Sequence, residues 1–202
     1  LSIRRQRQMC IRDRIMDLLE HNDFLTAQSQ KIREFYKYMA KEYPYLSFTF
    51  KGRIKSLIRA EAKFNGYVVE YIYDYYEKHA TYPSVVELGE KLNCFRDLIA
   101  YRIVISMPKC HVKDSNEREK QEIKYLYEIA NVLKDFLEER GFRAEPAGGV
   151  KKSTSELLRE EVRPYYRDYI TNVDPDGYRS LHITFFDNSA KCYMEMQLRT
   201  KQ

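Results

Sequence analysis

The sequence has few cysteines and no long apolar run. None of its cysteines form a CxxC pair; the four are Cys10, Cys94, Cys110 and Cys192. Zinc sites and disulfide frameworks need closely spaced or paired cysteines, so this scattered set indicates reduced thiols. The longest apolar stretch, residues 98–106, contains Arg102 and is far too short to cross a bilayer. Since no secretory signal is recognisable, the sequence predicts a cytoplasmic protein with no membrane partner.

Two common kinds of phosphate-binding loop are also missing. Residues 148–153, GGVKKS, contain the residue types of a Walker loop, but at the wrong spacing. A kinase-type glycine-rich loop is absent as well, and no internal repeat is visible. These absences argue against a P-loop nucleotide hydrolase, a protein kinase and a repeat protein.

Excess positive charge is confined to the start of the chain. The net charge is +5, and residues 1–14, LSIRRQRQMCIRDR, carry five arginines and one aspartate. The remainder has a net charge of only +1, which is poor evidence for binding DNA or RNA. The segment resembles translated adapter sequence from a sequencing library. We therefore expect residues 1–14 to be a non-native or disordered arm and residues 15–202 to form one domain.

Composition and periodicity indicate a single mixed domain. Tryptophan is absent, but 44% hydrophobic residues in 202 residues supply a core for one domain. Helices are expected at 15–43, with a break at Asn22-Asp23, in the cationic stretch after Gly52, and in a tyrosine-rich segment at 67–79. Ser84, with Glu87 three residues on, predicts the cap of a further short helix. Asn116 with Glu119 opens another helix, which Gly141 ends; its apolar stripe is Ile123, Leu126, Ala130, Leu133 and Leu137. Alternating or unbroken apolar patterns predict strands at 46–50, 98–105, 142–145, 178–186 and 192–200. The nearly unbroken apolar run at 98–105 is typical of a central strand that is buried on both faces. The predicted class is α/β (α+β), a mixed five-stranded sheet flanked by helices.

The last two expected strands each have an apolar and a polar face. Successive side chains of a strand point to opposite sides. In the first of these strands the polar side carries Tyr178, Ser180, His182 and Thr184. In the second it carries Glu195, Gln197 and Arg199. Together they offer acid, base and hydrogen-bonding groups; the alternative is the solvated outer face of an antiparallel sheet.

Phosphoryl transfer needs oxygen ligands for Mg²⁺, cations for developing charge, and a group that orients the nucleophile. Asp97 precedes the most hydrophobic strand, where an unpaired carboxylate is costly to desolvate unless a cation offsets it. The alternative is that Asp97 caps a helix or turn. Cations come from one stretch, Arg53, Lys55, Arg59 and Lys63, whose alternative role is a solvated helix face.

Five short motifs make the chemistry specific. Residues 177–182, GYRSLH, and 195–200, EMQLRT, resemble the paired GYxSLH and ExQxRT motifs of RelA/SpoT-type alarmone synthetases. Residues 97–102, DLIAYR, resemble that family's metal-binding strand, and residues 52–55, GRIK, followed by Lys63, resemble its ATP-binding segment. Residues 167–170, RDYI, are similar to the KDYI stretch before the acceptor loop. All five occur in the family's order over residues 52–200.

The resemblance implies a nucleotidyltransferase-like synthetase domain. Its members move pyrophosphate from ATP to the 3′-hydroxyl of GDP or GTP, making the stringent-response alarmone (p)ppGpp. Asp97 and Glu195 are implied as catalytic residues that hold Mg²⁺, with Glu195 also activating the 3′-hydroxyl. ATP binding is implied for Arg53, Lys55 and Lys63. Acceptor binding is implied for Tyr178, which would stack on the base, and for Arg167, His182, Gln197 and Arg199.

The chain departs from the family pattern in three places. Where the acceptor loop of the family reads YIxxPKxNGY, residues 169–178 read YITNVDPDGY, so Asp174 replaces a lysine. An insertion between Lys63 and Asp97 makes room for a tyrosine-rich helix at 67–79. The chain stops two residues after Thr200, where relatives continue, so we expect a C-terminally truncated domain.

Three functions therefore stay open. The first is (p)ppGpp synthesis from ATP and GDP or GTP. The second is a toxin-type synthetase that modifies the tRNA 3′ end and has an antitoxin partner; Asp174 favours it, whereas the near-neutral charge of residues 15–202 does not. The third is a catalytically silent nucleotide-sensing module, which the intact Asp97 and Glu195 disfavour. A homo-oligomer is the other expected partner, and DNA is not expected.

Overall fold

The computed structural model describes residues 22–54, 57–84, 86–88, 99–149, 151–190 and 192–201, with only the backbone for 22–29, 53–54 and 57–65. The helices in these ranges are α2 (Asn22–Glu42), α3 (Leu57–His79) and α5 (Ser115–Glu138). The strands are β1 (Ser47–Ile54), β2 (Ile99–Ser106), β3 (Phe142–Glu145), β4 (Tyr166–Asp168), β5 (Leu181–Asp187) and β6 (Cys192–Thr200). A single 3₁₀ turn at Arg163–Tyr165 leads into β4.

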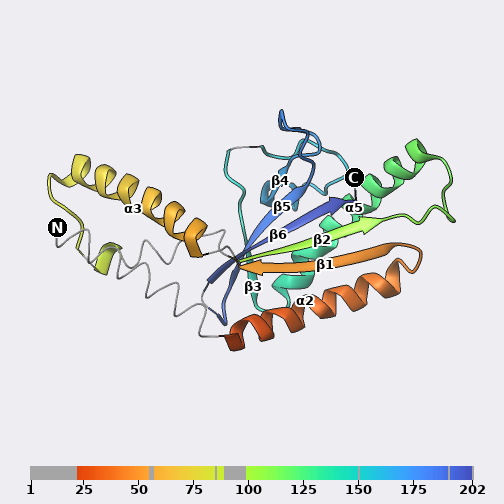
Figure 1. Cartoon of the computed structure of the whole chain (residues 1–202), viewed down its shortest axis with the longest axis horizontal. Coiled ribbons are helices and arrows are strands. Elements are labelled where there is room, and N and C mark those ends of the chain that lie inside the picture. The colour runs from red at the N-terminus through yellow and green to blue at the C-terminus, as the bar shows by residue number, and fades with distance from the viewer. Residues whose placement is uncertain are drawn as a thin grey trace.

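The strands form one mixed sheet (Figure 1). Their order is β1-β2-β6-β5-β3, and β4 pairs with β5 beside this path. β2 and β6 run parallel, and the other neighbouring strands are antiparallel. The predicted α+β class is confirmed. Five strands were predicted, but the sheet has six. The strand that was missed is β4, which has only three residues and cannot show a period-two pattern.

The strand β2 lies inside the sheet, as its apolar sequence predicts. Ile103 and Ile105 are fully buried and face the helices. The expectation that this strand is buried on both faces holds only at its start, where Ile99, Ala100 and Tyr101 are all buried. Beyond that point alternate side chains are only half-buried, so one face of the sheet is left accessible.

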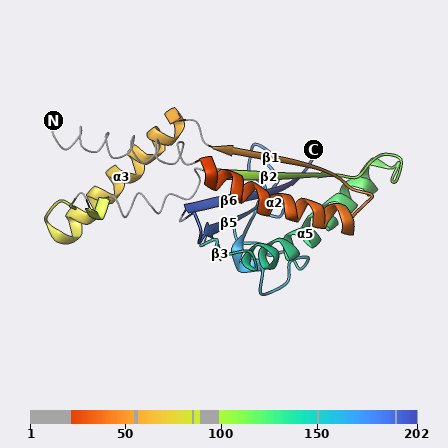
Figure 2. The ribbon, with the colours of Figure 1, turned by 90° about the horizontal axis from the view of Figure 1, so that it is seen from below.

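The helices α2 and α5 lie side by side on one face of the sheet (Figure 2). The rings of Phe35 and Phe136 meet edge to face, with 5.0 Å between their centroids. Met39, Leu126 and Leu133 are fully buried in the same core. Because both helices cover the same face, the opposite face is left for polar side chains.

The helix α3 extends away from the sheet (Figures 1 and 2) and joins the cationic stretch to the tyrosine-rich residues in one element. Arg53 lies in β1 and not in this helix, which corrects the expected boundary. The predicted cap after α3 is confirmed, because the Ser84 hydroxyl accepts from the Glu87 amide at 3.3 Å and Glu87 accepts from the Ser84 amide at 2.7 Å. None of the helices in the described ranges has an apolar stretch that could cross a membrane.

Two other boundaries differ from the prediction. Asp114 caps α5 by accepting a hydrogen bond from the Glu117 amide at 2.8 Å, so the helix begins before the expected Asn116. The strand β5 begins at Leu181, so Tyr178 lies in the preceding loop and not at the start of the strand. Gly177 has a φ of +74° there, which only glycine adopts without strain.

Candidate functional site

A row of polar side chains crosses the open face of the sheet. Lys51 pairs with Arg102, Arg102 with Gln197, Gln197 with His182, and His182 with Arg167. Directly paired residues on neighbouring strands project to the same side. The row therefore joins β1, β2, β6, β5 and β4 on the face that α2 and α5 leave uncovered.

Glu195 lies at the centre of the contacts made by this row. Its Oε2 accepts from the Arg167 guanidinium at 2.5 Å, and its Oε1 accepts from Gln197 Nε2 at 2.6 Å. His182 Nδ1 is 3.5 Å from the same Oε1. Arg102 donates twice to the Gln197 Oε1, at 3.1 and 3.0 Å, which fixes the amide with its nitrogen toward Glu195. The carboxylate is thus held in place from three sides.

The surroundings of Glu195 keep it ionised. Burial alone would raise its pKa, because desolvation disfavours the charged form. The contacts with His182, the hydrogen bond from Gln197 and the charge of Arg167 outweigh burial and lower the pKa of Glu195 from 4.5 to about 2. A carboxylate with so low a pKa is a weak proton acceptor near neutral pH. It is suited to orienting a hydroxyl or binding a cation.

The lowered pKa predicts a pH-dependent contribution to stability. A carboxylate whose pKa falls on folding stabilises the folded state above its unfolded pKa, and this is lost as the pH falls toward its folded pKa. Each pKa unit corresponds to about 1.4 kcal/mol, so the lowering from 4.5 to about 2 contributes about 3 kcal/mol above pH 5. Urea unfolding of the wild type and Glu195→Gln should show a difference of up to about 3 kcal/mol at pH 7 that narrows by more than about 1 kcal/mol by pH 3.5.

The matched control for this titration is Glu34→Gln. Glu34 accepts from Arg140 at 2.8 Å, but its side chain is 55% exposed, so its pair contributes little. The free energy of unfolding of the Glu34→Gln variant should stay within about 0.5 kcal/mol of that of the wild type. A wild-type minus Glu195→Gln difference that is constant between pH 7 and 3.5 would contradict the assigned contacts.

Aromatic rings border the Glu195 cluster. The Tyr178 hydroxyl is 3.0 Å from His182 Nε2, so one histidine nitrogen faces the tyrosine and the other faces Glu195. The Tyr169 ring lies 5.6 Å from the Tyr178 ring and 4.8 Å from that of His182, between centroids. The Arg199 guanidinium carbon is 5.9 Å from the centre of the Tyr178 ring. Tyr178 is half-buried, so part of its ring is accessible.

Asp174 forms an ion pair in the structure. It contacts the Lys151 ammonium, which also donates to the Asn172 carbonyl at 3.2 Å. The same ammonium lies 4.9 Å from the centre of the Tyr169 ring, a cation–π distance. The negative charge that replaces the expected lysine is therefore compensated by a lysine from a different loop.

Six of the ten predicted site residues lie in this one cluster: Arg167, Tyr178, His182, Glu195, Gln197 and Arg199. Asp97 and Lys55 lie outside the described residues. For Arg53 and Lys63 only the backbone is described, in β1 and α3. The predicted ATP-binding and metal-binding assignments therefore stay predictions.

Two members of the cluster had no predicted role. Arg102 fixes Gln197, and Tyr169 packs against the rings of Tyr178 and His182. Alternation along the strand could have placed Arg102 on the open face, since the residues on either side of it are apolar. Its contact with Gln197 depends on the parallel pairing of β2 with β6, which no local pattern reveals.

The donor atoms available to a metal ion are few. In the described part of the chain, no group of three or more histidine, cysteine, aspartate or glutamate side chains is placed to hold a metal. Glu195 is an ionised oxygen donor, and each of its oxygens has lone pairs beyond those used by Arg167 and Gln197. Mg²⁺ is usually held by one or two carboxylates together with substrate phosphates. Glu195 thus fits Mg²⁺ in kind, as one part of such a set.

Comparisons with solved structures give distant similarities. Neither the protein-family models nor the curated proteins include a match to this chain. Among solved structures, the chain is similar to a GTP pyrophosphokinase family protein from Streptococcus pneumoniae, with 17% sequence identity and a TM-score of 0.44. The similarity covers 91% of this chain and 70% of the other.

Proposed function

We propose that this protein is a nucleotide pyrophosphokinase, which transfers pyrophosphate from ATP to the 3′-hydroxyl of GDP or GTP. In this reaction the 3′-oxygen attacks the β-phosphorus of ATP and the bond between that phosphorus and the α,β-bridging oxygen breaks. AMP leaves with the bridging oxygen, and the hydroxyl proton passes to solvent. The observation that carries the proposal is the ionised Glu195, held by Arg167, Gln197 and His182 on the open face of the sheet.

The proposal is supported by where the motif segments lie. The GYRSLH segment enters β5 and the EMQLRT segment ends β6, and these strands pair so that His182 faces Gln197. The GRIK and DLIAYR segments contribute to β1 and β2, which also pair. Four segments that are far apart in the sequence are therefore neighbours in one sheet, as a shared reaction centre requires.

Glu195 and its partners have distinct roles in this proposal. Phosphoryl transfer proceeds through a loose transition state, so catalysis depends on positioning and charge stabilisation more than on removing the proton. Glu195, with a pKa of about 2, accepts a hydrogen bond from the 3′-hydroxyl and orients it toward the β-phosphorus. Arg167 and Arg102 bring positive charge to the same face, where negative charge develops on the transferred group.

Glu195 and Asp97 are the residues that would hold Mg²⁺ in this proposal. Asp97 is three residues before Ala100, which pairs directly with Glu195, and three residues of chain span at most about 11 Å. When bound, the ion would neutralise charge on the phosphate oxygens. Arg53, Lys55 and Lys63 are proposed to bind ATP on the β1 side, where Arg53 pairs with Ala100.

The aromatic border is proposed to receive the acceptor base. Tyr178 keeps an accessible ring and is oriented by His182, Tyr169 and Arg199. The Lys151–Asp174 pair removes the electrostatic objection that Asp174 raised against a guanine nucleotide. It also keeps an ammonium group beside the acceptor rings.

Tyr178→Ala should weaken acceptor use strongly and ATP use little. Stacking on a base contributes about 1–3 kcal/mol, so the acceptor KM should rise about 5- to 150-fold. Tyr178→Phe keeps the ring but loses the hydrogen bond to His182, and its acceptor KM should rise about 2- to 10-fold. Steady-state kinetics with each substrate varied in turn measure both constants. Equal rises in the two KM values for Tyr178→Ala would show that Tyr178 does not serve the acceptor alone.

A labelling experiment tests the proposed reaction. Purified protein is incubated with Mg²⁺ and γ-labelled ATP, with GDP, GTP or deacylated tRNA as the second substrate. We expect the label on GDP or GTP. Label on none of the three, from protein that is folded and binds ATP, would contradict the proposal and leave the silent nucleotide-sensing module.

The tRNA 3′ end is the second candidate acceptor. It is favoured by Asp174 at the position where guanine-nucleotide enzymes of the resembled family carry lysine. Label on tRNA in the same experiment, with none on GDP or GTP, would select it.

A further inference from the structure

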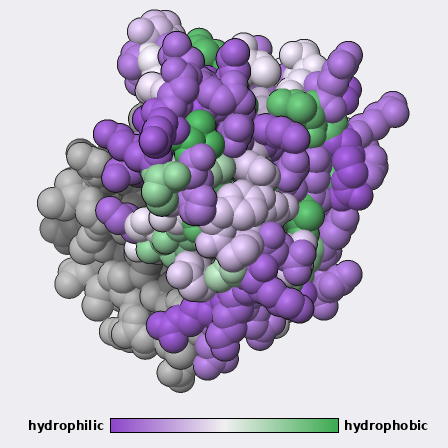
Figure 3. Space-filling view, turned by 90° about the vertical axis from the view of Figure 1, so that its right-hand side faces the viewer, coloured by the Kyte–Doolittle hydropathy of each residue, from purple (hydrophilic) through white to green (hydrophobic). Residues whose placement is uncertain are grey.

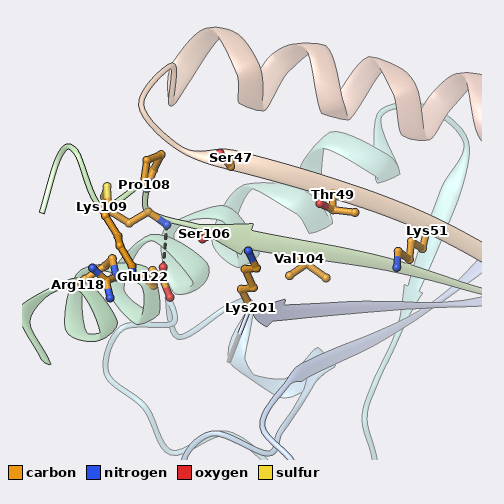
Figure 4. Close-up of a pocket in the computed structure, with 11 residues that line it drawn as sticks. Ser47, Thr49, Lys51, Val104, Ser106, Pro108, Lys109, Arg118, Glu122 and Lys201 are labelled. Atoms are coloured by element: carbon orange, nitrogen blue, oxygen red, sulfur yellow. Dashed lines mark hydrogen bonds between the residues drawn. The ribbon is translucent and has the colours of Figure 1, made fainter. Parts of the chain in front are cut away.

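A polar groove lies on the open face of the sheet, outside the Glu195 cluster. It is at the β1 edge, which is the edge opposite β3. It has a volume of about 600 Å³ and is formed by β1, the end of β2, the turn after β2 and the start of α5 (Figure 4). On its floor, Ser47 pairs with Ser106 and Thr49 with Val104. The volume is within the range of sites that bind small molecules.

Four cations surround this groove, and they come from different elements. Figure 4 shows Lys51 on β1, Lys201 just after β6, Lys109 in the turn and Arg118 on α5. Among the described residues, no carboxylate forms an ion pair with any of the three lysines. Positive charges that converge without compensation raise the local potential and attract an anion.

The one carboxylate that lines the groove has a structural partner. Glu122 is 3% exposed and accepts a hydrogen bond from the Met107 amide at 2.7 Å (Figure 4). This bond ties the turn after β2 to α5. Arg118 is fixed in the same region, because its guanidinium donates to the Val112 carbonyl at 3.1 Å. The turn that carries Lys109 is therefore held against a helix.

The groove adjoins the Glu195 cluster without being part of it. Lys51 lines the groove and pairs with Arg102, which donates to Gln197. From Lys51 the groove runs four residues along β1 to Ser47, about 13 Å at the usual rise of a strand. Figure 3 shows the molecule from the end where the turn after β2 lies, and this surface is mainly hydrophilic with scattered apolar residues.

We infer that this groove is a phosphate-binding site, which takes the phosphate groups of a nucleotide chain or of a free polyphosphate. Hydrogen bonds from lysine and arginine to phosphate oxygens are charge-assisted and therefore strong. The hydroxyls of Ser47, Thr49 and Ser106 add neutral donors on the floor. Several cations spread along a groove suit a ligand with several phosphates better than one with a single anionic group.

Fluorescence anisotropy with two probes tests this inference. The first is a labelled single-stranded RNA octamer that ends in a 3′-phosphate, so that it has no 3′-hydroxyl to accept pyrophosphate. The second is unlabelled inorganic tripolyphosphate, used as a competitor. Displacement of the octamer by tripolyphosphate would show that a free polyphosphate group is sufficient, whereas resistance to displacement would assign the groove to a nucleotide chain.

The double variant Lys109→Gln, Lys201→Gln removes two groove cations and touches no residue of the Glu195 cluster. It should weaken octamer binding about tenfold or more and reduce the slope of log K against log salt by about 1.4, since each phosphate contact with a single strand contributes about 0.7. The matched control is Lys37→Gln, Lys41→Gln, which removes two exposed lysines of α2 on the helical side. The arginines of residues 1–14 are present in both variants and contribute a common background.

Equal affinities for the groove variant and the control, with either probe, would overturn the inference. The result is independent of pyrophosphate transfer. Glu195→Gln should bind the octamer as tightly as the wild type. A wild type that binds the octamer through the groove cations but transfers no pyrophosphate would contradict only the proposed function.

Discussion

Replacing Glu195 with glutamine should lower pyrophosphate transfer about a thousandfold, a loss expected when a charged group that orients or stabilises the reacting atoms is removed. Glutamine has the same shape and keeps a carbonyl oxygen for Arg167 or Gln197, so the protein should fold. It lacks the negative charge that, in the proposed function, binds a cation and orients the 3′-hydroxyl. The kcat for transfer, measured with ATP, acceptor and Mg²⁺ all saturating, gives the effect.

The control for this loss is again Glu34→Gln, a glutamate paired with an arginine on the helical side of the sheet. It should transfer pyrophosphate at the wild-type rate. Circular dichroism and the urea midpoint at pH 7 establish that the Glu195 variant is folded in the assay. Turnover of Glu195→Gln near the wild-type rate would show that the carboxylate is not part of the reaction centre.

The largest expected effect on stability comes from Asp168, which lies between Arg167 and Tyr169 in the chain. Its carboxylate is completely buried and accepts four hydrogen bonds. Two come from hydroxyls, Tyr127 at 2.8 Å and Ser153 at 2.6 Å, and two from backbone amides, Ile170 at 2.8 Å and Thr171 at 2.9 Å. Burial and the charge of Asp168 both raise the pKa of Tyr127. This network ties α5 to the start of the loop that leads from β4 to Tyr178.

Asp168→Ala should lower the free energy of unfolding by about 3–5 kcal/mol, because it leaves several buried donors without an acceptor. Asp168→Asn keeps one oxygen for the two amides, and the hydroxyls can turn to accept from its amide nitrogen, so about 1–2 kcal/mol is expected. Tyr127→Phe removes one bond and should cost about 1 kcal/mol. Urea unfolding at pH 7 measures all three. Equal losses for the alanine and asparagine variants would mean that the hydrogen bonds do not carry the effect.

Much of the fold could be predicted from local patterns. The unbroken apolar run predicted the interior strand β2. The stripe of Ile123, Leu126, Ala130, Leu133 and Leu137 predicted the buried face of α5, and all of these residues are buried except Ile123, which is half-buried. Period-two alternation correctly placed Glu195 and Gln197 on one face, where their side chains meet. These features depend on neighbours within one element, which a single sequence records.

Other features depend on pairing between distant segments. β4 is too short for a pattern and exists because it pairs with β5. From the sequence, Asp174 was interpreted as a charge without a partner. No local pattern indicates that Lys151, from another loop, forms an ion pair with it. The groove cations Lys51, Lys109 and Lys201 are isolated in the sequence and converge only when β1, β2 and β6 form one sheet. The N-cap of α5 was predicted at Asn116, whereas the structure has it at Asp114, whose backbone is extended and whose side chain accepts from the Glu117 amide.

The most direct test of the central claim is the fate of ATP, followed by ³¹P NMR. Transfer of pyrophosphate breaks the bond to the β-phosphorus and releases AMP, whereas a kinase or a hydrolase that acts at the γ-phosphorus releases ADP. With GDP or GTP present, the wild type should form AMP and the 3′-pyrophosphorylated acceptor in equal amounts, and Glu195→Gln should form both about a thousandfold more slowly. Formation of ADP in place of AMP, or of AMP without a modified acceptor, would contradict the proposed function.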